Sequence, residues 1–481
     1  MSKASMHSFE FGRARPSAAA TDVCAIVPVL ACAYPAIIEP LIYSTFPPAP
    51  GLQGILESRI ENRIFWPALA AISVLLAARN SSRFAKFTLP PNIVCLLAYL
   101  AFAGASVAWA FKPALSFTRF AQEVMVLTSV VLPAMAALRT ADMMRGLFLC
   151  FAIASVVNLL FILDGGSQQV ATYGALKVNI GYPGYFTGKN LLGEFSAIAL
   201  LLSLHELLFP GRRRSFGIII AVAAISLLFL ANSKTALGLA LLVPFLAGLT
   251  LIIARRTRVS PAVILMTVPI CYIAVSSLTG FNINRISFLL YGDSTFTGRT
   301  LIWDFAQLEI ARKPFAGWGY QSFWLVGADA PSIVDAPGWI KGMPNAHSGY
   351  FDTILEMGYI GLALLLSFLV ATLHGIGRVA QSDRARAWLL LSLALFIMLY
   401  NFLESLWMRG FDLLWVVFVI VAAETARCSR PFPSARGASA ALRPARAGIP
   451  VPARGQRRLP LRMPIQSRRG YRGNTRPPVS I

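Results

Sequence analysis

The chain has 481 residues, of which 56% are hydrophobic and only 13% are charged. Its apolar residues occur in blocks of about 17 to 25, the length that crosses the hydrocarbon core of a bilayer. This pattern excludes a soluble globular enzyme and predicts an all-α, polytopic helical membrane protein. The formal net charge is +22, which in a soluble protein would indicate a nucleic-acid partner.

The excess charge lies mostly after Thr425, in a tail that holds thirteen arginines and no acidic residue. A tail rich in Pro, Gly, Ala and Arg cannot bury a core, so we predict a disordered cytosolic segment over residues 426–481. Basic tails also bind RNA or anionic lipid. The positive-inside rule already accounts for this charge, and we expect no nucleic-acid partner.

The apolar blocks predict twelve transmembrane helices after a cytosolic N-terminal tail, residues 1–21. The predicted helices lie near residues 22–43, 63–78, 92–111, 117–138, 144–163, 190–209, 215–232, 235–254, 260–279, 350–373, 387–403 and 408–425. The transmembrane domain is therefore expected over residues 22–425. One long hydrophilic loop, residues 280–349, separates the ninth and tenth helices.

The basic residues of the short loops predict the orientation of these helices. If the N-terminus is cytosolic, each short inner loop carries two or three Lys or Arg residues, whereas the short outer connections carry few. This asymmetry places both termini in the cytosol and the long loop in the periplasm of a bacterium. The periplasm lacks ATP and nucleotide sugars, so a reaction there needs a donor that is activated by other means.

Four outward-facing cations lie at or near the start of a span or helix: Lys189, Lys234, Arg299 and Arg409. Lys234 is the most informative, because a break of about three residues between two spans holds it at the membrane surface. Any one of these side chains could simply reach out to lipid headgroups. Four of them together, with few acidic residues nearby in sequence, favour an anion-binding site.

The segment of residues 298–312 has helical periodicity, and we expect Thr297 as its N-cap and Lys313-Pro314 as its end. Arg299 therefore lies in its first turn. Its predicted apolar stripe consists of Leu301, Phe305 and Leu308. A cation in the first turn opposes the helix dipole at a cost of roughly 0.3–1 kcal/mol. A bound anion would reverse that cost, because free helix N–H groups and the guanidinium would hold it together. We therefore predict a phosphate or pyrophosphate site, with a solvated loop arginine as the alternative.

His347 is the only histidine that this topology places on the outer face. Imidazole can act as a general base near neutral pH. A single histidine is more often structural, but this one lies where the loop meets the tenth span, level with the cations. No catalytic cysteine, Ser-His-Asp set or carboxylate pair competes with it on that face, and we predict that it is catalytic.

Aromatic residues and glycines alternate in the long loop. Aromatic rings on such a backbone can stack on sugars, and the alternative is anchoring at the membrane interface. The sugar-contact candidates are Trp303, Trp318, Tyr320 and Tyr350.

Charged residues also lie within the predicted spans. Arg119 and Glu123 are one helical turn apart and are expected to neutralise each other. Glu194 and Glu356 remain as ionisable groups in the membrane, with predicted supporting roles at the site.

Four motifs follow one another in the outward-facing part of the chain. They are Ser233-Lys234-Thr235, Gly298-Arg299 with Trp303, Gly317-Trp318-Gly319, and Asn345-Ala346-His347-Ser348-Gly349-Tyr350. In this order, and with a long loop late in the chain, they resemble the O-antigen ligase/polymerase superfamily (WaaL and Wzy type) over residues 189–409. The Ser-Lys-Thr form looks most similar to the exopolysaccharide-production branch.

The resemblance implies a metal-independent glycosyltransferase of the bacterial inner membrane, without a cofactor, whose donor is a glycan linked to undecaprenyl pyrophosphate. Arg299 and Lys234 would grip the pyrophosphate, and His347 would act as base or orient the acceptor. Ligases often have arginine where this chain has Lys234. The lysine offers phosphate a compact ammonium charge, whereas the guanidinium of arginine could form two parallel hydrogen bonds.

The acceptor stays open between a growing polysaccharide and the lipid A-core of lipopolysaccharide. For a polymerase, Lys189 or Arg409 would contact a second lipid-linked chain. A transporter of polysaccharide or lipid-linked sugar is the alternative function. In that case midplane charges such as Glu194 would matter more than His347.

Overall fold

A computed structural model describes residues 22–47, 59–84, 88–137, 140–165, 169–173, 176–209, 214–279, 288 and 298–428. The predicted tail 1–21, nearly all of the predicted tail 426–481, and the proposed cap Thr297 lie outside these residues. Within them, ten helices are long and apolar enough to cross a membrane. The protein is therefore a multi-pass helical membrane protein, as its composition predicts.

The elements follow one another in this order: α1 (Val23–Ala33), η1 (Tyr34–Ile38), α2 (Glu39–Thr45), α4 (Ile60–Arg79), η2 (Ser81–Arg83), α5 (Pro91–Ser106), η3 (Val107–Trp109), α6 (Pro113–Ala136), α7 (Thr140–Leu163), β1 (Gln169–Tyr173), β2 (Leu176–Gly181), α8 (Lys189–Leu208), α9 (Arg214–Ala231), α10 (Lys234–Thr257), α11 (Pro261–Thr279), α13 (Arg299–Arg312), α14 (Pro331–Val334), η4 (Gly338–Gly342), α15 (Gly349–Val379), α16 (Arg384–Tyr400) and α17 (Leu413–Cys428).

The first ten predicted spans coincide closely with helices of this list, the first of them formed by α1, η1 and α2 together. The largest difference is at the end of α15, which continues to Val379 instead of ending near residue 373. The last two predicted spans correspond to α16 and α17, which have 17 and 16 residues and are slightly shorter than the ten. Their crossing of the membrane stays a prediction.

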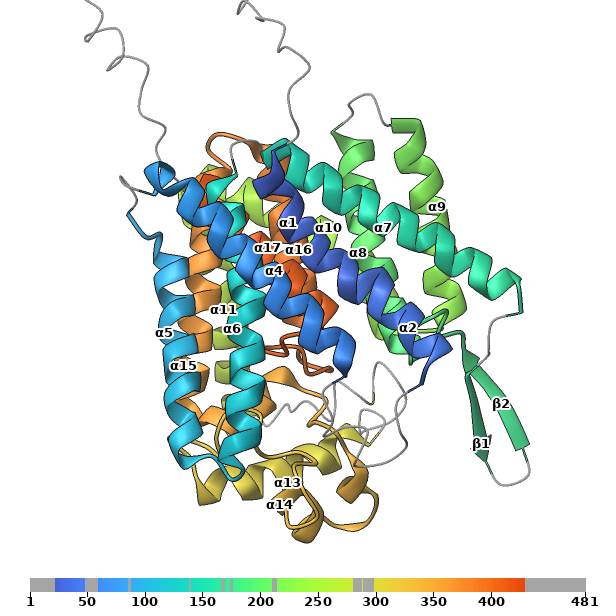
Figure 1. Cartoon of the computed structure of the whole chain (residues 1–481), viewed down its shortest axis with the longest axis vertical. Helices are drawn as coiled ribbons and strands as arrows, with labels where there is room; N and C mark the ends of the chain where they lie inside the picture. The colour runs from blue at the N-terminus through green and yellow to red at the C-terminus, as the bar shows by residue number, and fades with distance from the viewer. Residues whose placement is uncertain are drawn as a thin grey trace, which may run out of the picture. The chain divides into compact units, whose positions relative to one another are not determined.

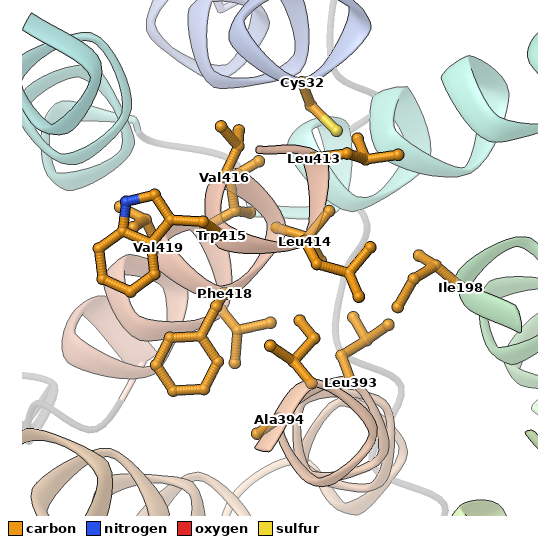
Figure 2. Close-up of a cluster of buried hydrophobic side chains, with 14 of the residues drawn as sticks. Cys32, Ile198, Leu393, Ala394, Leu413, Leu414, Trp415, Val416, Phe418 and Val419 are labelled. Atoms are coloured by element: carbon orange, nitrogen blue, oxygen red, sulfur yellow. The ribbon is translucent and has the colours of Figure 1, made fainter. Parts of the chain in front are cut away.

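The last helix, α17, forms the centre of the bundle. Every residue from Leu414 to Ala423 is fully buried, as expected for a helix that is apolar on all sides. Figure 2 shows this helix between Cys32 of α1, Ile198 of α8, and Leu393 and Ala394 of α16. It also packs against α6 and α15. Segments from both ends of the sequence therefore meet on one short helix.

A two-stranded antiparallel hairpin, β1 and β2, interrupts the helices between α7 and α8. We did not predict it, because two short strands beside long apolar spans give little periodic signal. Figure 1 shows the hairpin projecting near the end of α2, while α13 and α14 cover the end of the bundle below α5, α6 and α15. We call the end that carries α13 and α14 the loop end.

The helix α13 begins at Arg299, one residue later than predicted, with Gly298 in place of Thr297 at the N-cap position. It ends before Lys313, as predicted, but it packs through a different face. Of the predicted stripe, Phe305 is buried, but Leu301 and Leu308 are 49% and 68% exposed. Ile302, Ala306 and Ile310 are buried instead. The buried face is therefore centred roughly 100° around the helix axis from the predicted stripe, and of the three predicted residues only Phe305 belongs to it. The buried face also contains Glu309, which pairs with Arg312 at 3.0 Å. This polar residue interrupts the apolar periodicity of the face that packs against α15.

A backbone break in α15 fixes the long loop to the bundle. Gly358 has φ 65° and ψ −170°, so the helix is interrupted there. The carbonyls of Leu355 and Glu356 accept hydrogen bonds from the N–H groups of Trp318 and Gly319, both at 2.8 Å. Backbone groups freed at a helix break are thereby satisfied. The Gly-Trp-Gly motif thus serves close backbone packing, and a Cβ on Gly317 would lie only 2.4 Å from the Glu356 backbone.

Candidate active site

Glu404, in the turn between α16 and α17, joins three segments that are far apart in sequence. Its Oε1 accepts hydrogen bonds from the Arg299 guanidinium at 2.8 Å and from Asn190 Nδ2 at 3.0 Å. Its Oε2 lies 3.2 Å from Nδ1 of His347. We call Asn190, Arg299, His347 and Glu404 the Glu404 group. It brings the predicted pyrophosphate ligand Arg299 and the predicted base His347 together on one carboxylate.

Three helices begin at the Glu404 group. Arg299 is the first residue of α13, Asn190 is the second of α8, and α15 begins two residues after His347. The N–H of Gly349 donates to the carbonyls of Asn401 and Glu404 at 2.9 and 2.8 Å. Each helix start carries partial positive charge, so these helices attract an anion to the point where Arg299 lies.

The motif around His347 is held by hydrogen bonds to its backbone on both sides. Asn345 Oδ1 accepts from the His347 N–H at 2.9 Å, and Ser405 Oγ accepts from the Ser348 N–H at 3.0 Å. His347 has φ 48°, a left-handed conformation that is uncommon for a residue with a side chain. Such backbone strain is concentrated at functional sites, where surrounding contacts maintain it.

Gly349 has a packing role in the same motif. A Cβ at this position would lie 2.2 Å from Asn401 Oδ1 and 2.8 Å from Trp407. Its lack of a side chain therefore lets the start of α15 lie directly on the turn that carries Glu404.

The two predicted lysines lie next to this group. Lys189 donates through Nζ to the carbonyl of Ile180 in β2, at 2.8 Å, so the hairpin holds its side chain. Lys234 is exposed and close enough to Lys189 for mutual electrostatic repulsion. The residue before it, Ser233, interacts with the buried hydroxyl of Tyr400, which also lies within electrostatic range of Glu404 and Arg299. The start of α10 therefore borders the Glu404 group through Tyr400.

Arg409 belongs to a different cluster. Its Nη2 lies 3.1 Å from Asp352 Oδ2 and 2.9 Å from Glu356 Oε1, and both acids are buried. Asp352 Oδ1 in turn accepts from Trp324 Nε1 at 2.7 Å and from the Ala346 N–H at 3.0 Å. We call Arg409, Asp352 and Glu356 the Arg409 group. It ties the loop residues just before His347 to the first turns of α15.

The predicted pairing of Arg119 with Glu123 is wrong. Arg119 donates to the carbonyl of Gln321, and Glu123 accepts from Trp415 Nε1 at 2.8 Å. No ion pair between the two occurs in the described part of the chain. Packing of α6 between the loop and α17 gives each side chain a nearer partner than its neighbour on the same helix.

The four sugar-contact candidates differ in their surroundings. Tyr320 is fully buried, with its hydroxyl donating to the carbonyl of Met408 at 2.6 Å, and Trp303 is 7% exposed. Both rings therefore pack inside the protein in this structure. Trp318 and Tyr350 are half-buried, and their contact with sugar stays a prediction.

Sequence reasoning missed Glu404 and Asp352. An acidic residue in a short turn between two spans is a weak signal by itself, and Asp352 falls within a predicted helix. Their charged partners, His347 for Glu404 and Arg409 for Asp352, are more than 50 residues away, and only the folded chain brings them within reach. In the described residues, no group of three or more His, Cys, Asp and Glu side chains could hold a metal ion.

Comparison with known proteins agrees with the order of the motifs. Residues 219–366 match the Wzy_C family model, described as O-Antigen ligase. The expected resemblance to the O-antigen ligase family is confirmed. The matched segment contains Lys234, Arg299 and His347, whereas Lys189, Glu404 and Arg409 lie outside it.

A curated relative, "Exopolysaccharide production protein ExoQ" from Rhizobium meliloti (strain 1021), is 26% identical over 302 residues. The match covers 60% of this chain and 66% of that relative, slightly less than two thirds of the relative's length. This similarity agrees with the exopolysaccharide-production branch named from the Ser-Lys-Thr motif.

Proposed function

We propose that the protein is a glycosyltransferase of the bacterial inner membrane that moves a glycan from undecaprenyl pyrophosphate to an acceptor hydroxyl on the outer face. The observation that carries this proposal is the Glu404 group, in which a cation and an imidazole share one carboxylate at three helix starts. The family match and the name of the relative support glycan transfer in exopolysaccharide production. The acceptor is a growing polysaccharide or a lipopolysaccharide core.

In this reaction His347 acts on the acceptor, and Arg299 acts on the leaving group of the donor. The acceptor oxygen attacks the anomeric carbon of the donor, and the bond from that carbon to the pyrophosphate oxygen breaks. The acceptor proton passes to Nε2 of His347, because Nδ1 faces Glu404. Arg299, Lys234 and the helix starts stabilise the negative charge that develops on the departing lipid pyrophosphate. Cleavage of the bond between the glycan and the lipid pyrophosphate supplies the free energy for transfer.

Glu404 has two roles in this proposal. Without donor it balances the Arg299 charge, and an arriving pyrophosphate competes with it for the guanidinium. Glu404 is then left to orient His347 and to stabilise the imidazolium that forms during transfer. Binding of the donor thereby prepares the base.

Lys189 and Arg409 differ as contacts for a second lipid-linked chain, which a polymerase requires. Arg409 is already held by two buried carboxylates. Lys189 lies beside Asn190 and Lys234 at the start of α8 and is the better candidate.

Purified protein in lipid nanodiscs, supplied with lipid-linked repeat units, tests the proposal. We expect Arg299→Ala and His347→Ala each to lower the rate of product formation by about 10²-fold or more. Arg145→Ala, an exposed arginine of α7 whose contact with Asp142 is long at 3.8 Å, is the control and should retain full transfer. Full transfer by both site variants would overturn the mechanism.

The same preparation separates transfer from transport. A transporter would move labelled lipid-linked sugar across proteoliposomes without making new glycosidic bonds, whereas a glycosyltransferase makes longer or transferred glycan. Because side-chain cations supply the charge on the leaving group, we expect transfer to persist in excess EDTA. Loss of transfer in EDTA that added Mg²⁺ restores would contradict this part of the proposal.

A further inference from the structure

A cavity of about 130 Å³ lies between α2, α8 and the start of α17. Three carboxylates line it, from Glu39, Glu194 and Asp412, together with the aromatic rings of Tyr43, Phe186 and Phe411. Glu194 lies within electrostatic range of both Asp412 and Glu404. Glu194 therefore places this cavity next to Glu404.

Among the described residues, Glu194 differs from the other two acids in having no hydrogen-bond or ion-pair partner. Glu39 accepts hydrogen bonds from Tyr43 and Asn62, at 3.0 and 3.1 Å, and Asp412 accepts from the Trp415 N–H at 3.0 Å. The Glu194 side chain is only 2% exposed, and no described residue forms a hydrogen bond or ion pair with it. A buried polar group without a partner is costly, so this carboxylate is an acceptor that a ligand could satisfy.

The geometry of α8 connects the cavity to the site of transfer. Asn190 and Glu194 are four residues apart and so lie on the same face of the helix, with their Cβ atoms about 6 Å apart. Asn190 binds Glu404, whose other oxygen contacts His347. A molecule that binds Glu194 is therefore held close to the proposed base.

The lining of the cavity selects the chemistry of its ligand. The described residues that line it include three acids and no Lys or Arg, so they offer no cation to a pyrophosphate. Sugar hydroxyls donate hydrogen bonds to carboxylates, and the apolar faces of a sugar ring stack on aromatic side chains. The first donor sugar is bonded to pyrophosphate, whereas the sugar that carries the accepting hydroxyl is remote from any phosphate. The acceptor sugar therefore fits this cavity better than the donor sugar.

We propose that this cavity binds the terminal sugar of the acceptor glycan, with Glu194 accepting hydrogen bonds from its hydroxyl groups. The proposal rests on the proposed function, since it assigns one of the two glycans of that reaction to a subsite. Glu39 and Asp412 complete the polar wall, and Phe186 and Phe411 provide surfaces for stacking.

Binding without turnover tests the subsite. The probe is the repeat-unit oligosaccharide, released from its lipid by mild acid and labelled with a fluorophore at its reducing end. Its affinity for the purified full chain in nanodiscs is measured by fluorescence anisotropy, with no lipid-linked donor present. Glu194→Gln replaces one carboxyl oxygen by an NH₂ group at nearly constant volume and should weaken binding by about tenfold. Glu206→Gln, at the other end of the same helix, is the control and should bind as the native chain does.

A second variant protects the test against misfolding. Asp412→Asn keeps the side-chain oxygen that accepts from the Trp415 N–H, so the start of α17 stays capped. It should also weaken binding of the oligosaccharide, by a smaller factor than Glu194→Gln. Both variants are compared with the native chain for monodisperse elution and thermal unfolding.

The outcomes separate this inference from the proposed function. Unchanged affinity in folded Glu194→Gln and Asp412→Asn, or no binding by the native chain at millimolar oligosaccharide, would overturn the subsite even if transfer occurs. Weakened binding in these variants, with normal binding but no transfer by His347→Ala, supports it. Absence of transfer by the native chain would count against the proposed function, whatever the anisotropy shows.

Discussion

Arg299 and Arg409 look equivalent in the sequence, yet the fold gives them opposite surroundings. Their side chains are similarly exposed, at 17% and 22%. Arg409 lies between two buried carboxylates, and its charge is fully opposed. Arg299 shares a single carboxylate with His347 and Asn190 at three helix starts. The lysines and helix starts beside the Glu404 group add positive charge that Glu404 does not balance, so an arginine alone does not mark an anion site.

The difference predicts that Arg409 matters more for stability than Arg299 does. Arg409→Met leaves Asp352 and Glu356 buried with their main counter-charge removed, which should lower the free energy of unfolding by about 3–5 kcal/mol. Arg299→Met leaves Glu404 hydrogen-bonded to Asn190 and close to His347, so its loss should be smaller. Thermal unfolding in the same detergent measures both. A larger loss for Arg299→Met would contradict the comparison.

Glu404→Gln tests the role of the carboxylate that Arg299 and His347 share. Glutamine keeps one oxygen for Arg299 and Asn190 but cannot stabilise an imidazolium, so we expect kcat for transfer to fall by about tenfold or more. The KM for lipid-linked donor should stay constant or decrease, because the Arg299 guanidinium becomes freer to bind pyrophosphate. A rise in KM with unchanged kcat would show that Glu404 acts on donor binding alone.

Asp329→Asn should have the smallest effect on stability and on transfer. It tests whether the loss of any charge pair at the loop end would impair the protein as the loss of Arg299 or Arg409 does. Asp329 pairs with Lys112 at 2.7 Å on the surface. The hydrogen bond from Lys112 lowers the pKa of the Asp329 carboxyl, so the pair stabilises the fold above the ordinary Asp pKa and loses this effect as the pH falls. Exposed pairs contribute little. The unfolding temperature and the transfer rate at neutral pH should match the native chain.

Local sequence predicted the parts of the fold that local physics governs. The apolar blocks located ten helices closely, and α13 begins one residue after its predicted start and ends before Lys313, as its end signal predicted. The face through which α13 packs was predicted wrongly, because the buried Glu309 looks like a solvent-facing residue until Arg312 is placed beside it. The break at Gly358 was also missed, since its satisfied carbonyls depend on Trp318 and Gly319 from the loop.

The sequence likewise predicted only part of the candidate site. The sequence by itself determined the membrane class, the positions of the helices and the residue types available for chemistry, because hydrophobic length and helix periodicity act over short stretches. It singled out Arg299, Lys234 and His347 before any contact was known. Only the tertiary structure decided that Glu404 joins Arg299 to His347 and that Arg409 is neutralised by Asp352 and Glu356. The physical reason is that electrostatic balance depends on distances of a few ångströms between residues that the chain separates by 50 or more positions.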